Sequence, residues 1–139
     1  MTTTVFDRMT MPPCATLLGW HLLDARPEEG WIRIGFEGRR EFCNPAGFVQ
    51  GGLLSAMLDD TMGPAVFAMT DGKLFTSTIS LTVNFLAPAK PGPITGEARV
   101  TQLGAFAYAV LASQAERRVV TPEPAFVQTA AQEHGIDSA

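Results

Sequence analysis

The segment from Gly51 to Met62 constrains the fold of this chain more than any other. Its apolar residues recur at helical spacing and on several sides of the predicted helix, at Leu53, Leu54, Met57, Leu58 and Met62. A surface helix keeps a polar face, so a helix this apolar must be covered by other elements. The sequence therefore predicts a long central helix with a sheet wrapped around it.

The predicted helix contains a proline about three turns after its start, in the pair Gly63-Pro64. Proline has no backbone N–H, so the carbonyl of Asp60 loses its partner within the helix. We therefore expect a kink at this point.

Strand patterns lie on both sides of the helix. Leu17–Ala25 and Trp31–Glu37 predict a hairpin, and residues 75–86 alternate between apolar and polar as one long strand. Further strands are predicted over Ile94–Gln102, Phe106–Arg117 and Ala125–Ala130, with Leu103-Gly104 and Arg117-Arg118 as the connections. One apolar helix beside one antiparallel sheet is an α+β fold.

The 139 residues predict a single domain over 1–139, with an N-terminal arm over about 1–16 and a frayed tail over about 132–139. No apolar run reaches the roughly 20 residues that cross a bilayer, and the N-terminus does not resemble a signal peptide. We therefore expect a cytoplasmic protein without a membrane partner. The net charge of -4 argues against nucleic acid, and Cys14 and Cys43 predict neither a disulfide nor a metal site.

Unusual residues for a helix start occur at Gly51 and Gly52. Two glycines lower helix propensity, but they let another molecule approach the first free N–H groups of the helix. With the helix dipole behind them, these groups suit an oxyanion hole. An ordinary glycine-bearing helix start is the alternative.

Two adjacent carboxylates, Asp59 and Asp60, lie in the middle of this helix. They are about 100° apart around the helix axis, so at most one faces a given cleft. A carboxylate in such an apolar helix suggests a general base or a nucleophile. A solvated pair on an exposed stripe is the alternative.

The joint spacing of these residues resembles a known family. Asparagine, diglycine, aspartate and a proline-terminated strand occur as Asn44, Gln50-Gly51-Gly52, Leu58-Asp59 and Phe85-Leu86-Ala87-Pro88-Ala89. This pattern resembles the hotdog-fold acyl-CoA thioesterases of the phenylacetic-acid-degradation type, over roughly Leu17 to Ala130. The resemblance implies a hotdog fold, hydrolysis of an acyl- or aryl-CoA thioester without a cofactor or metal, and homodimers or homotetramers.

The resemblance also implies roles for single residues. The Gly51 N–H would bind the thioester carbonyl, Asp59 would act as base or nucleophile, and Asn44 would orient a catalytic group or a water. Thr78 is the nearest match to an assisting hydroxyl, with Ser77 as the other choice. Substrate contacts are predicted for Gly52, Ser77 and Lys90, the last one to a nucleotide phosphate.

One position departs from the family pattern. Many relatives carry histidine directly before the diglycine, whereas this chain has Gln50, which can donate a hydrogen bond but cannot titrate near neutrality. His21 and His134 lie outside the motif. A hotdog dehydratase or hydratase, which needs a histidine base, is therefore disfavoured. A non-catalytic acyl-CoA binding module is the other alternative, although such sensors usually carry a fused output domain.

Helix geometry predicts that two subunits share each active site. Gly51 and Asp59 are eight residues apart, and a rise of about 1.5 Å per residue separates them by roughly 12 Å. A group that attacks a carbonyl must approach within roughly 3–3.5 Å. Two antiparallel helices related by a two-fold axis would bring Gly51 of one chain beside Asp59 of the other.

Overall fold

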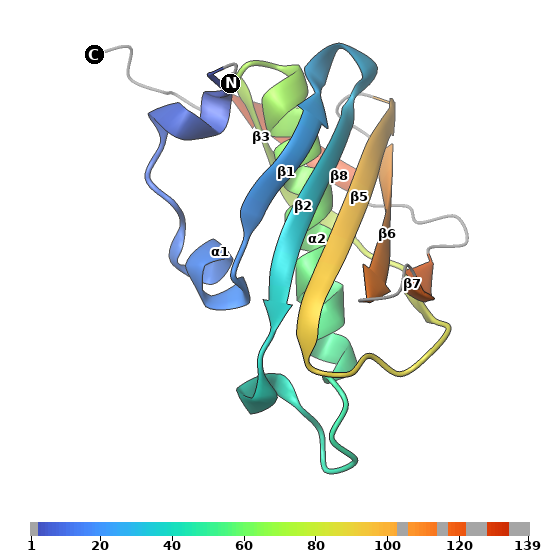
Figure 1. The fold of residues 1–139 in the computed structure, drawn as a ribbon. Helices are drawn as coiled ribbons and strands as arrows, with labels where there is room; N and C mark the ends of the chain where they lie inside the picture. The colour runs from blue at the N-terminus through green and yellow to red at the C-terminus, as the bar shows by residue number, and fades with distance from the viewer. Residues whose placement is uncertain (1–2, 103–105, 114–116, 122–127, 134–139) are drawn as a thin grey trace.

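The structure of the chain is a computed structural model that describes residues 3–102, 106–113, 117–121 and 128–133. The helix α2 (Gly51–Met69) runs along the inner face of the curved antiparallel sheet (Figure 1). In the described part of the chain the strand order of this sheet is β1-β2-β5-β6-β7-β4. The strands span His21–Arg26 (β1), Trp31–Gly38 (β2), Asn84–Phe85 (β4), Gly92–Gln102 (β5), Phe106–Ser113 (β6) and Arg117–Thr121 (β7).

A second antiparallel ribbon lies on the other side of α2. It pairs β3 (Leu74–Ser80) with β8 (Gln128–Glu133). Because α2 contacts β3 as well as β2, β5 and β6, strands cover it from more than one direction. The predicted α+β architecture, an antiparallel sheet around one long central helix, is confirmed.

The main hydrophobic core lies between α2 and the strands β2 and β5. Along β2, Ile32, Ile34 and Phe36 are at most 1 % exposed, as the predicted alternation requires. On the opposite face Arg33 and Glu37 are exposed, but Gly35 is buried beside the ring of His21. On the helix, buried side chains occupy positions from the second turn to the last: Leu54, Met57, Leu58, Thr61, Met62, Ala65, Val66, Phe67 and Ala68. Each large apolar side chain buried in this way stabilises the fold by about 1.5–3 kcal/mol.

Pro64 lies inside α2, and the helix continues past it to Met69. The carbonyl of Asp60, which has no donor at position 64, accepts a hydrogen bond of 3.0 Å from the indole N–H of Trp20. A buried carbonyl without a donor costs about 1–3 kcal/mol. The Trp20 bond removes that cost and joins the helix to the start of β1.

The N-terminal arm extends beyond the predicted residue 16 and is partly helical. It contains a 3₁₀ turn, η1 (Val5–Arg8), and a short helix, α1 (Pro13–Leu18). Helix α1 ends at Gly19, whose φ of 70° is left-handed and whose added Cβ would lie 2.7 Å from the Cβ of Glu37. The strand predicted over Leu17–Ala25 therefore begins only at His21. We call residues 3–18 the N-terminal arm.

Several strand predictions need correction. The strand predicted over residues 75–86 is interrupted at residues 81–83, and its two parts pair separately with β8 and β7. Arg117 and Arg118, predicted as a connection, begin β7 and pair with β6. Gln132 and Glu133, predicted as frayed, pair with β3.

The other predictions near the C-terminus lie outside the described residues. They are the Leu103-Gly104 connection, the beginning of the strand predicted over Ala125–Ala130, the remainder of the tail and His134.

Candidate active site

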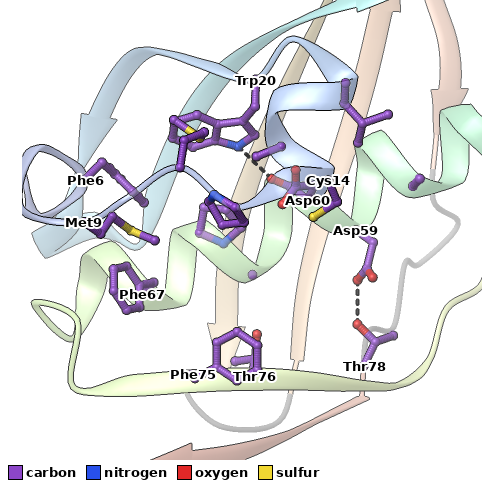
Figure 2. Close-up of a pocket in the computed structure, with 17 residues that line it drawn as sticks. Phe6, Met9, Cys14, Trp20, Asp59, Asp60, Phe67, Phe75, Thr76 and Thr78 are labelled. Atoms are coloured by element: carbon purple, nitrogen blue, oxygen red, sulfur yellow. Dashed lines mark hydrogen bonds between the residues drawn. The ribbon is translucent and has the colours of Figure 1, made fainter. Parts of the chain in front are cut away.

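Asp59 and Thr78 form the centre of the candidate site. Asp59 lies in the middle of α2, and Thr78 lies on β3, which crosses that part of the helix. The Thr78 hydroxyl donates a hydrogen bond of 2.6 Å to Asp59 Oδ1, drawn as a dashed line in Figure 2. This bond fixes one carboxylate oxygen and leaves the other available to a water or a substrate.

An apolar cavity of about 560 Å³ adjoins this pair. The N-terminal arm forms one wall, and α2 and β3 form the others. The lining residues are Phe6, Met9, Met11, Pro12, Cys14, Ala15, Leu18, Trp20, Ala56, Asp59, Asp60, Gly63, Pro64, Phe67, Phe75, Thr76 and Thr78. A cavity with an apolar lining and a few converging polar groups is the usual form of a small-molecule site.

Asp60 lines the same cavity on the side of the arm, near Cys14 and Trp20 (Figure 2). Its Oδ2 atom is buried, and no donor among the described residues meets it. Burial, and secondly the charge of Asp59, raises the pKa of Asp60 to about 6. Asp60 is therefore a carboxyl group that changes its charge close to neutral pH.

The diglycine lies at the first turn of α2, and Gln50 is the residue that precedes the helix. Among the described residues, no acceptor meets the N–H of Gly51 or Gly52. The ring of Phe85 lies against Gly51, where an added Cβ would be 3.1 Å from Phe85 Cζ. The helix start thus combines free N–H donors with a backbone that a neighbouring group can approach closely.

Asn44 lies in the loop before α2 and does not line the cavity. Its side-chain oxygen accepts the N–H groups of Ala46 and Phe48, at 3.0 and 3.1 Å. Asn44 therefore shapes its own loop, and only its amide NH₂ group can meet a ligand. The predicted action of Asn44 on a catalytic group or a water stays a prediction.

Lys90 is exposed and follows Ala89, whose carbonyl accepts the N–H of Val49. This bond holds Lys90 near the start of α2, at the same end of the helix as the diglycine. Ser77, the other candidate hydroxyl, lies on β3 directly before Thr78 but outside the cavity lining.

The structure therefore divides the predicted site residues into two groups. Asp59 and Thr78 lie together at the cavity, whereas Gly51 and its neighbours lie at the helix start, roughly 12 Å away along the helix axis. The sequence analysis predicted that at most one of Asp59 and Asp60 faces a given cleft. This prediction is wrong, because the cavity extends from β3 to the arm and both carboxyl groups line it. Sequence reasoning also missed the arm residues as parts of the cavity. No pattern marks them, because the chain from Phe6 to Trp20 meets α2 only after folding.

Among the described residues, no group of three or more histidine, cysteine, aspartate or glutamate side chains could hold a metal ion. No helix in that part of the chain is long and apolar enough to span a membrane.

The family model of the thioesterase superfamily matches residues 46–117, more than half of the chain. This chain belongs to the thioesterase superfamily, a class of thioester hydrolases.

Known structures show the same fold. A phenylacetic acid degradation-related protein of Ralstonia eutropha JMP134 is 30% identical, with a TM-score of 0.70 over 91% of this chain and 92% of its own. A hypothetical thioesterase protein of Streptococcus pneumoniae TIGR4, solved with coenzyme A, is 18% identical, with a TM-score of 0.70 over 83% of this chain and 87% of its own. These matches confirm the hotdog fold and the resemblance to thioesterases of the phenylacetic-acid-degradation type.

A protein of Saccharolobus solfataricus that carries the name of a proposed esterase is 31% identical over 77 residues. The match covers 55% of this chain and 54% of that protein, so this chain matches about half of its relative's length.

Proposed function

We propose that this protein hydrolyses an acyl- or aryl-CoA thioester to the free acid and CoA, with Asp59 as the catalytic carboxylate. The observation that carries the proposal is the hydrogen bond between Thr78 and Asp59 at the edge of an apolar cavity. A carboxylate with one oxygen fixed and the other open can activate a water or attack a carbonyl. The cavity beside it suits the apolar part of a thioester.

In the general-base route, Asp59 accepts a proton from water as the water oxygen bonds to the acyl carbon. The carbonyl oxygen becomes negative, and the carbon–sulfur bond then breaks. Protonated Asp59 returns its proton to the CoA thiolate. A thiol has a reference pKa of about 8.5 and an aspartic acid about 3.9, so this transfer is favourable without a histidine acid. Such a route is compatible with Gln50 at the position where many relatives carry histidine.

In the nucleophilic route, Asp59 attacks the acyl carbon directly, CoA leaves, and water hydrolyses the resulting anhydride. A single turnover in ¹⁸O-labelled water, combined with chemical trapping, separates the two routes, because label in the product acid alone is also the result of the general-base route. The nucleophilic route places the label in the Asp59 side chain, if water attacks at the carboxylate carbon, or only in the product acid, if water attacks at the acyl carbon. Trapping of an acylated Asp59 with hydroxylamine then identifies the anhydride.

The N–H of Gly51 is proposed to stabilise the negative carbonyl oxygen, with the Gln50 amide and Gly52 beside it. Since Gly51 and Asp59 of one chain are roughly 12 Å apart, they cannot act on one carbonyl. We therefore propose a homodimer, or a tetramer built from two such dimers, in which Gly51 of one subunit serves the Asp59 of the other.

The polar part of CoA is proposed to lie at the start of α2. Lys90, Arg39 and Arg40 are exposed. The two arginines lie near this end of the helix, because Phe42 forms backbone hydrogen bonds with both Arg39 and Gln50. Cations at this end suit the phosphates of CoA. The S. pneumoniae protein was solved with coenzyme A, which is consistent with the same class of ligand.

The test of activity is release of free thiol from a panel of acyl- and aryl-CoA esters, followed with a thiol-reactive dye. The expected result is turnover of at least one ester, and loss of that turnover in Asp59→Asn. Binding of esters without thiol release would instead identify a non-catalytic binding module.

The test of the shared site is complementation. Gly51→Pro removes the N–H at the first helical position, where proline is tolerated, and Gly51→Ala is its control because it adds a Cβ against Phe85 and keeps the N–H. In a mixed dimer of Asp59→Asn and Gly51→Pro chains, one site carries both lesions and the other none. Activity should return to about half of the wild-type value per dimer. Mixed dimers that are verified by mass and stay inactive would place the site within one chain.

A further inference from the structure

We infer that the cavity between the N-terminal arm and α2 holds the apolar acyl chain of the thioester, and that Met9 and Met11 of the arm set the preference for long over short chains. This inference rests on the proposed function and names its substrate class. The cavity would take an apolar acyl group much longer than acetyl.

The direction of the cavity supports this assignment. Figure 2 shows Asp59 and Thr78 at one end of the lining and Phe6, Met9 and Phe67 at the other. Asp59 and Phe67 are eight residues apart on α2, which corresponds to roughly 12 Å along the helix axis. A thioester carbonyl at Asp59 would therefore direct its acyl chain along about two helical turns. An acetyl group would leave most of the 560 Å³ unfilled.

The arm is fixed on both sides of the cavity wall that it forms. The ring of Phe6 packs against Trp20 and Phe67, with centroids 5.1 and 6.0 Å apart. Arg8 forms an ion pair with Asp71 just beyond the end of α2. Further along, α1 leads into Trp20, which is bonded to the helix backbone. These contacts hold the arm in place as one wall of the cavity.

Met9 and Met11 lie in the stretch between these two anchors. They line the cavity but remain 38% and 40% exposed, so other protein atoms do not fill the space beside them. Methionine is flexible and adapts to apolar ligands of irregular shape. A ligand chain in the cavity would cover both side chains, and each buried methylene should raise kcat/KM roughly fourfold.

The first test compares kcat/KM for octanoyl-CoA and acetyl-CoA. In Met9→Asp/Met11→Asp, two charges line the cavity, and the octanoyl-to-acetyl ratio should fall at least tenfold. Leu17→Asp is the matched control, because Leu17 is in the same arm, is 52% exposed and does not line the cavity. It should leave the ratio unchanged. Met9→Ser/Met11→Ser replaces the charged variant if that variant does not fold. A ratio equal to that of wild type in a folded double variant would overturn the inference.

The second test measures binding without turnover. Trp20 lines the cavity, whereas Trp31 stacks with Arg26 and Arg33, so Trp31→Phe isolates the Trp20 emission. In an Asp59→Asn/Trp31→Phe chain, octanoyl-CoA should change this emission and free CoA should not. The change should be lost when the two methionine substitutions are added. Equal responses to octanoyl-CoA and free CoA would reject the assignment.

Together the two tests distinguish a wrong proposed function from a wrong cavity assignment. If no ester is hydrolysed but octanoyl-CoA still changes Trp20 emission, the proposed function is wrong and the cavity assignment holds. If esters are hydrolysed with a chain-length ratio that the arm variants do not change, the proposed function holds and the cavity assignment is wrong.

Discussion

At the midpoint of α2, the adjacent residues Asp59 and Asp60 have different surroundings on the two sides of the helix. On the side of β3, Asp59 receives a hydroxyl donor from Thr78. On the side of the N-terminal arm, the buried Oδ2 of Asp60 has no donor among the described residues, and the Asp60 carbonyl is bonded to Trp20. Two identical neighbouring side chains thus enter different surroundings because one helical step rotates them by about 100°. The elements packed on each side, and not the residue type, determine what each carboxyl can do.

The largest expected difference between the two sides is in turnover. Asp59→Asn should keep the fold and lower kcat at least a hundredfold, because an amide neither accepts the proton nor attacks the carbonyl. Asp60→Asn is the matched control and should lower kcat less than tenfold. Thiol release under saturating substrate measures both. The reverse order of effects would assign the chemistry to the side of the arm.

A smaller effect is expected from the donor on the side of β3. Thr78→Val keeps the shape of the side chain and removes the hydroxyl that fixes Asp59. We expect kcat to fall about tenfold with little change in KM, since the lost contact holds the proposed catalytic group in place. Thr78→Ser should restore most of the rate. If the serine variant were as slow as the valine variant, the methyl group and not the hydrogen bond would matter.

The side of the arm should control the pH dependence of stability. Burial raises the pKa of Asp60 from 3.8 to about 6, so the folded state binds this proton more tightly than the unfolded state does. The stability that the proton provides is complete below about pH 4 and is lost as the pH rises to 6 and above. Asp60→Asn should therefore be more stable than wild type at pH 8, by about 1–2 kcal/mol after allowance for solvent screening.

Thermal unfolding from pH 4 to 8 checks this prediction. The difference in melting temperature between wild type and Asp60→Asn should shrink towards pH 4. Asp24→Asn, an exposed carboxylate on β1, is the control and should show no such trend. A constant difference across the range would mean that ionisation of Asp60 does not affect stability.

The smallest expected effect concerns the hydrogen bond from Trp20 to the backbone carbonyl of Asp60, on the side of the arm. Trp20→Phe removes the donor to the Asp60 carbonyl and should lower the free energy of unfolding by about 1 kcal/mol more than the lost packing alone. In a Pro64→Ala background, the substituted residue offers its own backbone N–H to that carbonyl, so the extra loss should disappear. Urea unfolding of the four chains gives the coupling between positions 20 and 64. Additive effects would show that the indole bond contributes nothing measurable.

The central helix and the strands around it could be predicted from the sequence, because they depend on the periodicity of apolar residues. The alternation of Ile32, Ile34 and Phe36 and the apolar helix from Gly51 were sufficient to predict a sheet around a central helix. The break at residues 81–83 was not predictable, because the alternation continues through it and pairing with two separate strands interrupts it. Likewise, the strand predicted from Leu17 began too early, because Pro13 at the start and Gly19 at the end define a short helix that includes Leu17 and Leu18.

The candidate site was predictable in part. The family resemblance pointed to Asp59 within the adjacent pair, and it gave Thr78 as the nearest match to an assisting hydroxyl, with Ser77 as the other choice. With Gln50 in place of the histidine of many relatives, the motif offered no side chain expected to titrate near neutrality. Asp60 does titrate close to neutrality, since the arm from distant sequence buries it. Burial by distant segments is a property that no local pattern contains.

The bond between Trp20 and the Asp60 carbonyl also restricts the order in which relatives of this protein can change. A lineage that replaces Pro64 first gains a donor within the helix, after which Trp20 is free to vary. A lineage that replaces Trp20 first retains a carbonyl without a donor beside the proposed catalytic carboxylate. Substitution of Pro64 should therefore precede substitution of Trp20. Relatives that keep the proline should keep an indole, or another hydrogen-bond donor, at position 20.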